Sequence, residues 1–261
     1  MHKLTAVITG ASEGLGKSFA IELAQANTNL VLAALPNSGL PQLAAFMTRN
    51  FSIRVDYFEM DLTETANCIS LFEAIKEKGI VADILINNAG LGNWSWFDEK
   101  SLSFYRTQIE LNIITPVLLT RLFLAQVHRQ RKSYLLNVGS LGGLFIVPRK
   151  QVYGATKSFI RYFTRCLQME LSNSNVSVTL LSPGGINTKP ELLVLNHNIK
   201  GLSRFTIMEP EQVAKEALKG MFSGKREIVP GLLNRMLVLL NTILPRGLKE
   251  YIIQRKLKAM F

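Results

Sequence analysis

The chain has 261 residues, 48% of them apolar and 19% charged, which excludes a disordered chain and places it near the upper size of one hydrophobic core. Two cysteines and three scattered histidines exclude a disulfide framework and predict that no metal is held by protein ligands. The net charge of +11 favours an anionic partner, such as a nucleotide, a nucleic acid, an acyl-CoA or a membrane surface.

The chain begins with Met1–Thr9, which leads into a glycine turn without an apolar targeting segment. The longest uncharged stretch, Asn27–Thr48, contains two prolines and several asparagines, so it does not predict a spanning helix. We therefore expect a cytoplasmic protein in which Cys68 and Cys166 are free thiols.

Short apolar runs of strand length recur along the chain. They are Thr5–Thr9, Leu30–Ala34, Ile84–Ile86, Tyr134–Val138 and Val176–Leu181, with Arg226–Val229 as a sixth candidate. Such continuous runs are typical of parallel strands buried on both faces. Helical patterns lie between them, at Lys17–Ala26, Thr65–Lys78, Tyr105–Gln130 and Val152–Leu171. This alternation predicts an α/β fold: a single-domain, Rossmann-type, doubly wound parallel sheet over residues 1–224.

A glycine-rich turn, Thr9–Gly16, separates the first strand from the first helix. Its glycines allow a positive φ angle and a close approach of the backbone to an anion. The start of the following helix offers free N–H groups to a pyrophosphate. An ordinary tight turn has the same composition, but the position between strand and helix favours nucleotide binding.

Tyr153 and Lys157 lie four residues apart on a predicted helix, so their side chains share one face. A free tyrosine has a pKa near 10, and a neighbouring ammonium lowers that pKa towards the range useful for acid–base catalysis. Ser140 follows the strand Tyr134–Val138, at the sheet edge where doubly wound proteins bind ligands. In isolation the Tyr–Lys spacing also occurs by chance on solvated helices.

Together these segments resemble the short-chain dehydrogenase/reductase family, and the resemblance extends from residue 1 to about residue 224. Besides the glycine turn, Ser140, Tyr153 and Lys157, the matching segments are Asp61-Leu62, Asn87–Gly90, Asn112 and Pro183–Thr188, in the family's order. The resemblance implies an enzyme that transfers a hydride between NAD(P) and a carbonyl/alcohol pair.

The resemblance also implies residue roles. Tyr153 exchanges a proton with the substrate oxygen, Ser140 binds that oxygen, Lys157 holds the nicotinamide ribose and lowers the tyrosine pKa, and Asn112 positions a water. The implied cofactor-binding residues are Tyr153 and Lys157 together with Gly10, Ser12, Gly14, Leu15, Gly16, Asp61, Leu62, Asn88, Ala89, Gly90, Pro183, Gly184, Ile186 and Thr188.

The segment after the second strand, Ala33–Ser38, lacks the features that select a cofactor in this family. It contains neither the acidic residue that binds the ribose of NAD nor the basic residue that binds the 2′-phosphate of NADP. The missing acid and the positive net charge favour NADP(H) slightly over NAD(H), whereas Glu13 in the glycine turn opposes a 2′-phosphate.

The segments expected around the substrate are mainly apolar. The candidate contacts are Trp94, Trp96, Leu141 and Phe145, although both tryptophans are equally compatible with simple core packing. We expect an apolar ketone or a 3-oxoacyl group as substrate. The alternatives are a non-catalytic nucleotide-binding scaffold on the same fold and, less favoured, a nucleic-acid binder.

The tail, residues 225–261, lies beyond this resemblance and is expected to be an amphipathic helical extension. Residues 215–261 carry ten basic and three acidic side chains. At 100° per residue, one helix face gathers Leu232, Leu233, Met236, Leu237, Leu239, Leu240, Ile243 and Leu244. We expect this face to cover the domain, the substrate mouth or a partner subunit of a homodimer or homotetramer. Peripheral contact with an anionic membrane is the alternative.

Overall fold

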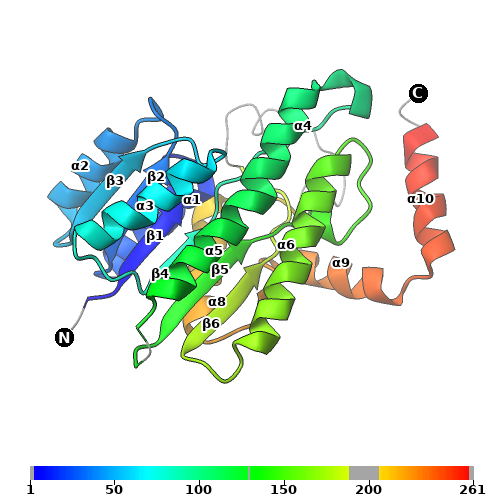
Figure 1. Ribbon diagram of the computed structural model, residues 1–261. Helices are drawn as coiled ribbons and strands as arrows, with labels where there is room; N and C mark the ends of the chain where they lie inside the picture. The colour runs from blue at the N-terminus through cyan, green and yellow to red at the C-terminus, as the bar shows by residue number, and fades with distance from the viewer. Residues whose placement is uncertain (1–2, 129, 188–205, 259–261) are drawn as a thin grey trace.

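The structure is a computed structural model that describes residues 3–128, 130–187 and 206–258. Figure 1 shows a single sheet of parallel strands in the order β3-β2-β1-β4-β5-β6-β7. The strands are β1 (Thr5–Thr9), β2 (Asn29–Ala34), β3 (Val55–Glu59), β4 (Ile84–Asn87), β5 (Ser133–Val138), β6 (Val176–Leu181) and β7 (Glu227–Ile228). The direction of strand addition reverses between β1 and β4, which confirms the predicted doubly wound sheet.

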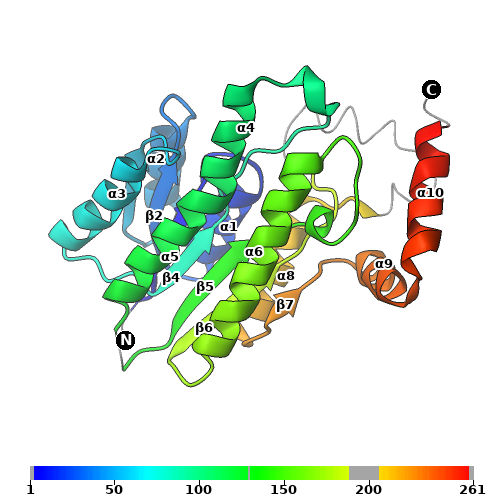
Figure 2. The same ribbon diagram turned by 45° about the vertical axis from the view of Figure 1, so that its right-hand side comes forward.

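Helices cover both faces of this sheet, as Figures 1 and 2 show. One face carries α1 (Gly14–Gln25), α2 (Leu40–Asn50) and α8 (Pro210–Phe222), and the other carries α3 (Thr65–Glu77), α5 (Thr115–Gln126) and α6 (Gln151–Glu170). Each face has its own apolar core, centred on Phe19 and Met47 on the first side and on Phe72 and Phe123 on the second. Burial on both faces explains why the central strands are continuously apolar.

Two elements were not expected from apolar runs. The edge strand β3 alternates partly buried and exposed residues, because only one of its edges pairs with a neighbour. Helix α2 lies inside the proline-containing stretch 27–48. It begins after Gly39, whose φ of 77° suits glycine, and it accommodates Pro41 in its first turn, where no backbone N–H is needed.

The single helix expected over 105–130 is interrupted. It consists of α4 (Leu102–Ile109), one π-helical turn η2 (Glu110–Ile114) and α5. Within the described ranges, this run of 102–126 is the one helix long and apolar enough to cross a membrane. It packs against α3 and contributes Leu119 and Phe123 to the core, so it serves as a core helix of the domain.

The chain after β7 forms α9 (Leu232–Ile243) and α10 (Arg246–Lys258), which extend to the margin of the molecule in Figures 1 and 2. The expectation that the apolar face of α9 covers the domain is wrong for five of its side chains. Leu232, Met236, Leu239, Leu240 and Ile243 are 50–72% exposed. The described residues therefore leave these five side chains uncovered.

Candidate active site

The glycine turn and the segment after β4 meet at the carboxyl edge of the sheet, beside the switch between β1 and β4. Thr9 Oγ1 accepts hydrogen bonds from the backbone N–H groups of Asn88 and Ala89, both at 3.0 Å. Asn88 Nδ2 donates in return to the carbonyls of Thr9 at 2.9 Å and Gly10 at 3.1 Å. A Cβ on Gly16 would lie 2.0 Å from the Gly10 carbonyl oxygen, so only glycine permits this contact.

The first turn of α1 is open to an anion. Glu13 precedes the helix in an extended conformation, and within the described part of the chain no side chain caps that turn. Gly10 and Gly14 have φ angles of 61° and 50°, which turn the backbone so that N–H groups converge. Ser12 is half-buried beside them and Leu15 is buried under the helix. This arrangement suits the pyrophosphate of a dinucleotide.

A carboxylate that sequence reasoning missed lies beside the end of β2. Glu59 Oε1, at the end of the neighbouring strand β3, accepts the backbone N–H of Asn37 at 3.0 Å. Ser38 Oγ is buried there and has no partner among the described residues, whereas Leu35 is 57% exposed. The parallel register of β2 and β3 pairs Ala34 with Glu59, and this pairing exists only in the folded sheet.

Asp61 and Leu62 follow β3 on the same edge. Asp61 Oδ1 accepts the N–H of Thr63 at 2.9 Å and its hydroxyl at 2.8 Å, which fixes an exposed carboxylate. Leu62 is buried, and its carbonyl accepts the Thr115 hydroxyl at 2.6 Å. This bond ties the segment to the start of α5.

Tyr153 stands in the first turn of α6, and its ring lies between two glycines. A Cβ on Gly92 would lie 3.4 Å from one edge of the ring, and a Cβ on Gly142 would lie 3.4 Å from the other. Ser140 Oγ accepts the N–H of Gly142 at 3.0 Å, and the Ser140 side chain lies close enough to Tyr153 to lower the pKa of that tyrosine. The structure therefore brings the two predicted hydroxyls together.

Lys157 lies one helical turn further along α6 and is buried. Its Nζ donates to the Val138 carbonyl at 2.8 Å and lies 5.9 Å from the centre of the Tyr153 ring. A Cβ on Gly90 would lie 3.5 Å from this Nζ, so Gly90 leaves an approach to the ammonium. One bond to Val138 leaves two further N–H donors for a ligand.

The pKa values in this cluster differ from the sequence-based expectation. Burial raises the pKa of Tyr153, and the nearby Ser140 side chain opposes that rise only in part. Burial also lowers the pKa of Lys157 to about 8. The expected lowering of the tyrosine pKa by Lys157 is absent among the described residues, because Lys157 Nζ donates to the Val138 carbonyl and lies 5.9 Å from the ring centre.

Asn112 is fully buried in the π-helical turn η2 and acts as a clamp. Its Oδ1 accepts the N–H of Leu91 at 2.8 Å, and its Nδ2 donates to the Leu91 carbonyl at 2.9 Å and to Thr156 Oγ1 at 3.0 Å. The extra residue of the π turn directs this side chain towards α6. Asn112 thereby joins the segment after β4 to the helix that carries Tyr153.

Two cations that were not among the expected substrate contacts lie against the two tryptophans that were. Lys150 Nζ lies 5.1 Å from the Trp94 ring centre and 5.4 Å from that of Tyr153, while the Arg149 guanidinium lies 5.3 Å from the Trp96 ring. Burial lowers the pKa of Lys150. Trp94 is 53% exposed and Trp96 partly buried, so neither is a simple core residue. Leu141 is buried and Phe145 partly buried in the loop after β5.

The segment after β6 completes the predicted set. Pro183 is buried, and Ile186 forms a bridge with Met208. Gly184 packs against Asn234 of α9, since a Cβ there would lie 2.8 Å from Asn234 Oδ1. The predicted contact Thr188 lies outside the described residues.

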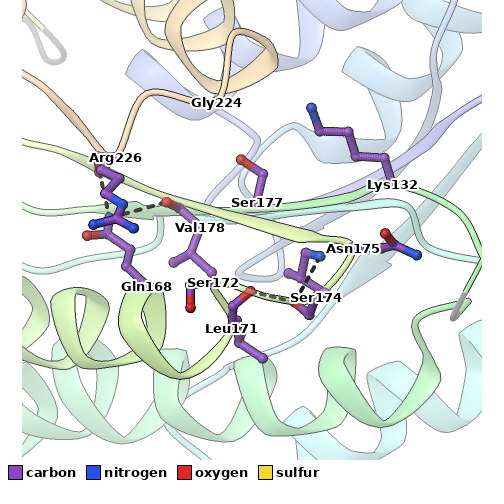
Figure 3. Close-up of a pocket in the computed structure, with 11 residues that line it drawn as sticks. Lys132, Gln168, Leu171, Ser172, Ser174, Asn175, Ser177, Val178, Gly224 and Arg226 are labelled. Carbon is purple, nitrogen blue, oxygen red and sulfur yellow. Dashed lines mark hydrogen bonds between the residues drawn. The ribbon is translucent and has the colours of Figure 1, made fainter.

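A separate pocket of about 320 Å³ lies at the opposite end of the strands from the predicted site, near the amino ends of β5, β6 and β7 (Figure 3). Lys132, Gln168, Ser174 and Arg226 are among its lining residues, and Gln168 donates to the carbonyls of Val178 and Arg226. None of the predicted site residues lines it. Among the described residues, no cluster of three His, Cys, Asp or Glu side chains could hold a metal ion.

The described residues fit a nicotinamide dinucleotide. The turn at α1 is open to a pyrophosphate, the unpartnered Ser38 hydroxyl lies where the adenosine end is expected, and Lys157 has donors to spare. The tyrosine and serine hydroxyls stand at the other end of the same edge. This arrangement can hold a dinucleotide along the sheet and protonate an oxygen beside its nicotinamide.

Comparisons with known proteins agree with this geometry. Residues 4–197 match the family model described as short chain dehydrogenase. The chain is 30% identical to 17-beta-hydroxysteroid dehydrogenase type 3 of Mus musculus over 243 residues, covering 88% of this chain and 75% of that one. A short-chain dehydrogenase of Sphingobium yanoikuyae, solved with NADPH, superposes with a TM-score of 0.78 at 25% identity, covering 93% and 97% of the two chains.

A second solved structure shares the fold. A short chain dehydrogenase/reductase of Burkholderia phymatum, solved with NAD, gives a TM-score of 0.80 at 23% identity over 91% of this chain and 92% of that one. The family match extends through the cofactor turn, the catalytic strand and the tyrosine helix. The chain belongs to the short-chain dehydrogenase/reductase family, and it is an NAD(P)-dependent oxidoreductase of carbonyl and alcohol groups.

Proposed function

We propose that Ser140, Tyr153 and Lys157 carry out this reaction on an apolar ketone or a 3-oxoacyl group. The observation that carries the proposal is the Tyr153 ring held between Gly92 and Gly142, with the Ser140 side chain nearby and the buried Lys157 ammonium 5.9 Å from the ring centre. A non-catalytic scaffold would have no use for a proton donor arranged in this way.

In the reduction direction, the bound nicotinamide supplies the hydride. Ser140 and Tyr153 both hydrogen-bond the carbonyl oxygen, and Tyr153 gives that oxygen its proton. Burial raises the pKa of Tyr153, so its hydroxyl is protonated at neutral pH, and the proton moves because the alkoxide formed on hydride transfer is a stronger base than the phenolate left behind. Lys157 would hold the ribose hydroxyls with its two remaining N–H donors, and Asn112 fixes the backbone of Leu91 in the segment after β4.

The apolar surroundings support an apolar substrate. Trp94 shares the Lys150 ammonium with Tyr153 and is 53% exposed, and the mouse relative is named for a hydroxysteroid. The test is a panel of aliphatic, cyclic and 3-oxoacyl ketones with NADH or NADPH, followed by cofactor absorbance. We expect cofactor oxidation matched one to one by alcohol for a bulky apolar ketone. A panel in which only sugars or small polar ketones react would contradict this substrate class.

For the cofactor, the geometry favours NAD(H), against the slight preference for NADP(H) expected from the sequence. Glu59 lies beside Asn37 at the adenosine end, and Glu13 stands before α1. Two carboxylates near a ribose accept hydrogen bonds from its hydroxyls and repel a 2′-phosphate.

We predict that Glu59→Gln raises the affinity for NADPH relative to NADH by about tenfold, the effect of removing roughly 1.4 kcal/mol of repulsion. Leu35→Arg should act in the same direction by adding a cation for the phosphate. Glu73→Gln, which neutralises a carboxylate of α3, is the matched control and should leave the ratio unchanged. Cofactor fluorescence titrations measure both affinities, and an unchanged ratio for Glu59→Gln and Leu35→Arg would show that the adenosine end lies elsewhere.

We also propose a homodimer formed through α6 and the helix beside it. Tyr162 and Met169 of α6 are 75% and 74% exposed, and Phe159, Ile109 and Ile114 are about 40% exposed. Apolar side chains on two adjacent helices fit a self-complementary interface. Met169→Asp should shift the protein to monomer in light scattering, whereas Leu102→Asp, a change at a 90% exposed leucine of α4, should not.

A cytoplasmic location, compatible with the free thiols of Cys68 and Cys166, remains part of the proposal.

A further inference from the structure

Helix α9 is oriented the opposite way to an ordinary packing helix. Its buried residue is polar: Asn234 is 1% exposed and donates to the carbonyls of Thr206 at 3.2 Å and Pro230 at 2.9 Å. Five of its large apolar side chains are instead directed outward, whereas Leu233, Leu237 and Val238 are partly buried. A packing helix buries its apolar stripe and exposes its polar residues.

The outward side chains of α9 lie on one face of the helix. At 100° per residue, the exposed group falls within an arc of about 100° centred opposite Asn234. It consists of Leu232 (72% exposed), Met236 (58%), Leu239 (62%), Leu240 (50%) and Ile243 (69%). Beyond Pro245, α10 adds Leu248 (45%) and Tyr251 (60%), one turn apart. We call these seven side chains the tail strip. Exposed apolar side chains grouped on one helix face, as on α9, mark an interaction surface.

The charge around the tail strip restricts what can cover it. Helix α10 carries Arg246, Lys249, Arg255, Lys256 and Lys258 against one acidic residue, Glu250, which makes the helix strongly basic. Arg246 pairs with Glu250, so most of the positive charge on the helix is not balanced within it. A second copy of this chain would bring an equally basic helix to the same place, and like charges would oppose that contact. An anionic lipid surface complements both the leucines and the cations.

We propose that α9 and α10 dock this enzyme on an anionic membrane surface, with the tail strip immersed among the acyl chains and the basic side chains of α10 at the headgroups. Helix α9 has 12 residues, too few to span a bilayer, so it lies in the interface. Tyr251 beside the cationic residues suits the same depth, because its ring is apolar and its hydroxyl polar.

The position of α9 links this surface to the active site. The helix starts where Asn234 contacts Gly184 and Thr206, which border the segment after β6. Docking there would place the substrate side of the enzyme close to the bilayer, where apolar ketones accumulate. This last step rests on the proposed substrate class, whereas membrane binding itself does not.

The test is co-sedimentation of the full chain with vesicles of neutral phosphatidylcholine, or with half of it replaced by phosphatidylglycerol. The wild type should bind the anionic vesicles at least about tenfold more tightly than the neutral ones, and more weakly as salt rises. Leu239→Ser/Ile243→Ser should lower that affinity at least about tenfold. Both side chains are exposed, so folding is retained, and Leu102→Ser is the matched control, which should bind as the wild type does.

Two further variants separate the possible outcomes. Arg255→Gln/Lys256→Gln should weaken binding to anionic vesicles, whereas Arg49→Gln/Lys100→Gln, which removes two exposed charges elsewhere, should have a clearly smaller effect. Tyr153→Phe should bind vesicles normally, so a failed ketone assay leaves this inference standing. Equal binding by the wild type and Leu239→Ser/Ile243→Ser would overturn the proposal. So would a loss of dimer without loss of vesicle binding in that variant, because the strip would then be a subunit interface.

Discussion

Tyr153, Ser140 and Lys157 occupy three different environments within one small cluster. Burial raises the pKa of the tyrosine and lowers that of the lysine, and these shifts in opposite directions both favour uncharged forms. Keeping a proton donor neutral is useful for reduction, because a protonated phenol is the form that donates. A buried lysine with one carbonyl partner is costly to keep charged, and an oxygen-rich ligand such as a ribose would offset that cost.

This cost predicts a specific dependence of stability on pH. Because the pKa of Lys157 falls from 10.5 to about 8 on folding, the unfolded chain binds more protons than the folded chain between these values. Its penalty is therefore fully present below pH 8 and disappears as pH rises towards 10.5. Relative to Lys157→Met, the wild type should gain about 2 kcal/mol in free energy of unfolding between pH 7 and pH 9.5.

Urea unfolding of both proteins at the two pH values measures this difference, and other titrating groups cancel in the comparison. An equal change in the free energy of unfolding between the two pH values for wild type and Lys157→Met would show that the Lys157 ammonium is not desolvated.

At the scale of elements, the helices hold the site through a few buried polar side chains. Asn112 in η2 fastens the segment after β4 to α6. Asn87 and Asn137 bond across β4 and β5 at 2.8 Å, and Asn137 continues to Thr164 of α6 at 3.0 Å. Asn234 fastens α9 to the segment after β6. Each contact supplies directional hydrogen bonds between buried polar groups of neighbouring segments.

Asn234 gives the element-scale prediction. Asn234→Ala should lower the free energy of unfolding by about 1–3 kcal/mol, because two buried carbonyls lose their donor. Asn241→Ala, on the same helix but only partly buried, should change it by less than about 0.5 kcal/mol. Chemical denaturation of the two variants makes the comparison, and equal destabilisation would mean that α9 is not anchored through Asn234.

The strands that are buried on both faces were the elements most readily predicted from sequence. Central strands buried on both faces have an unambiguous apolar signature, whereas the half-exposed edge strand β3 has none, and its Glu59 was missed with it. Helix α2 was missed because Pro41 suggests a helix breaker, whereas Gly39 and Pro41 in fact mark where the helix starts. The π turn is not recognised from the periodicity of apolar residues, because one extra residue shifts that pattern by a single position within an otherwise continuous helix.

For the molecule as a whole, the fold and the catalytic set follow from segments in a family-specific order, but the partner surfaces do not. The tail was recognisable as amphipathic, yet amphipathicity does not say which face meets the domain. Asn234 decides this, because its bonding partners Thr206 and Pro230 exist only in the folded chain. Likewise, cofactor preference depends on which strand end lies beside Ala34, and that follows from sheet register.

The central claim is that Tyr153 is the proton donor of a carbonyl reductase. Tyr153→Phe removes one hydroxyl and keeps the ring between Gly92 and Gly142, so cofactor binding should be close to that of the wild type. Tyr162→Phe makes the same chemical change on the exposed side of α6 and is the control. With the best ketone of the panel, kcat should fall at least about a hundredfold in Tyr153→Phe and stay within about twofold in Tyr162→Phe. Retention of near wild-type kcat by Tyr153→Phe, with NADH binding intact, would contradict the account.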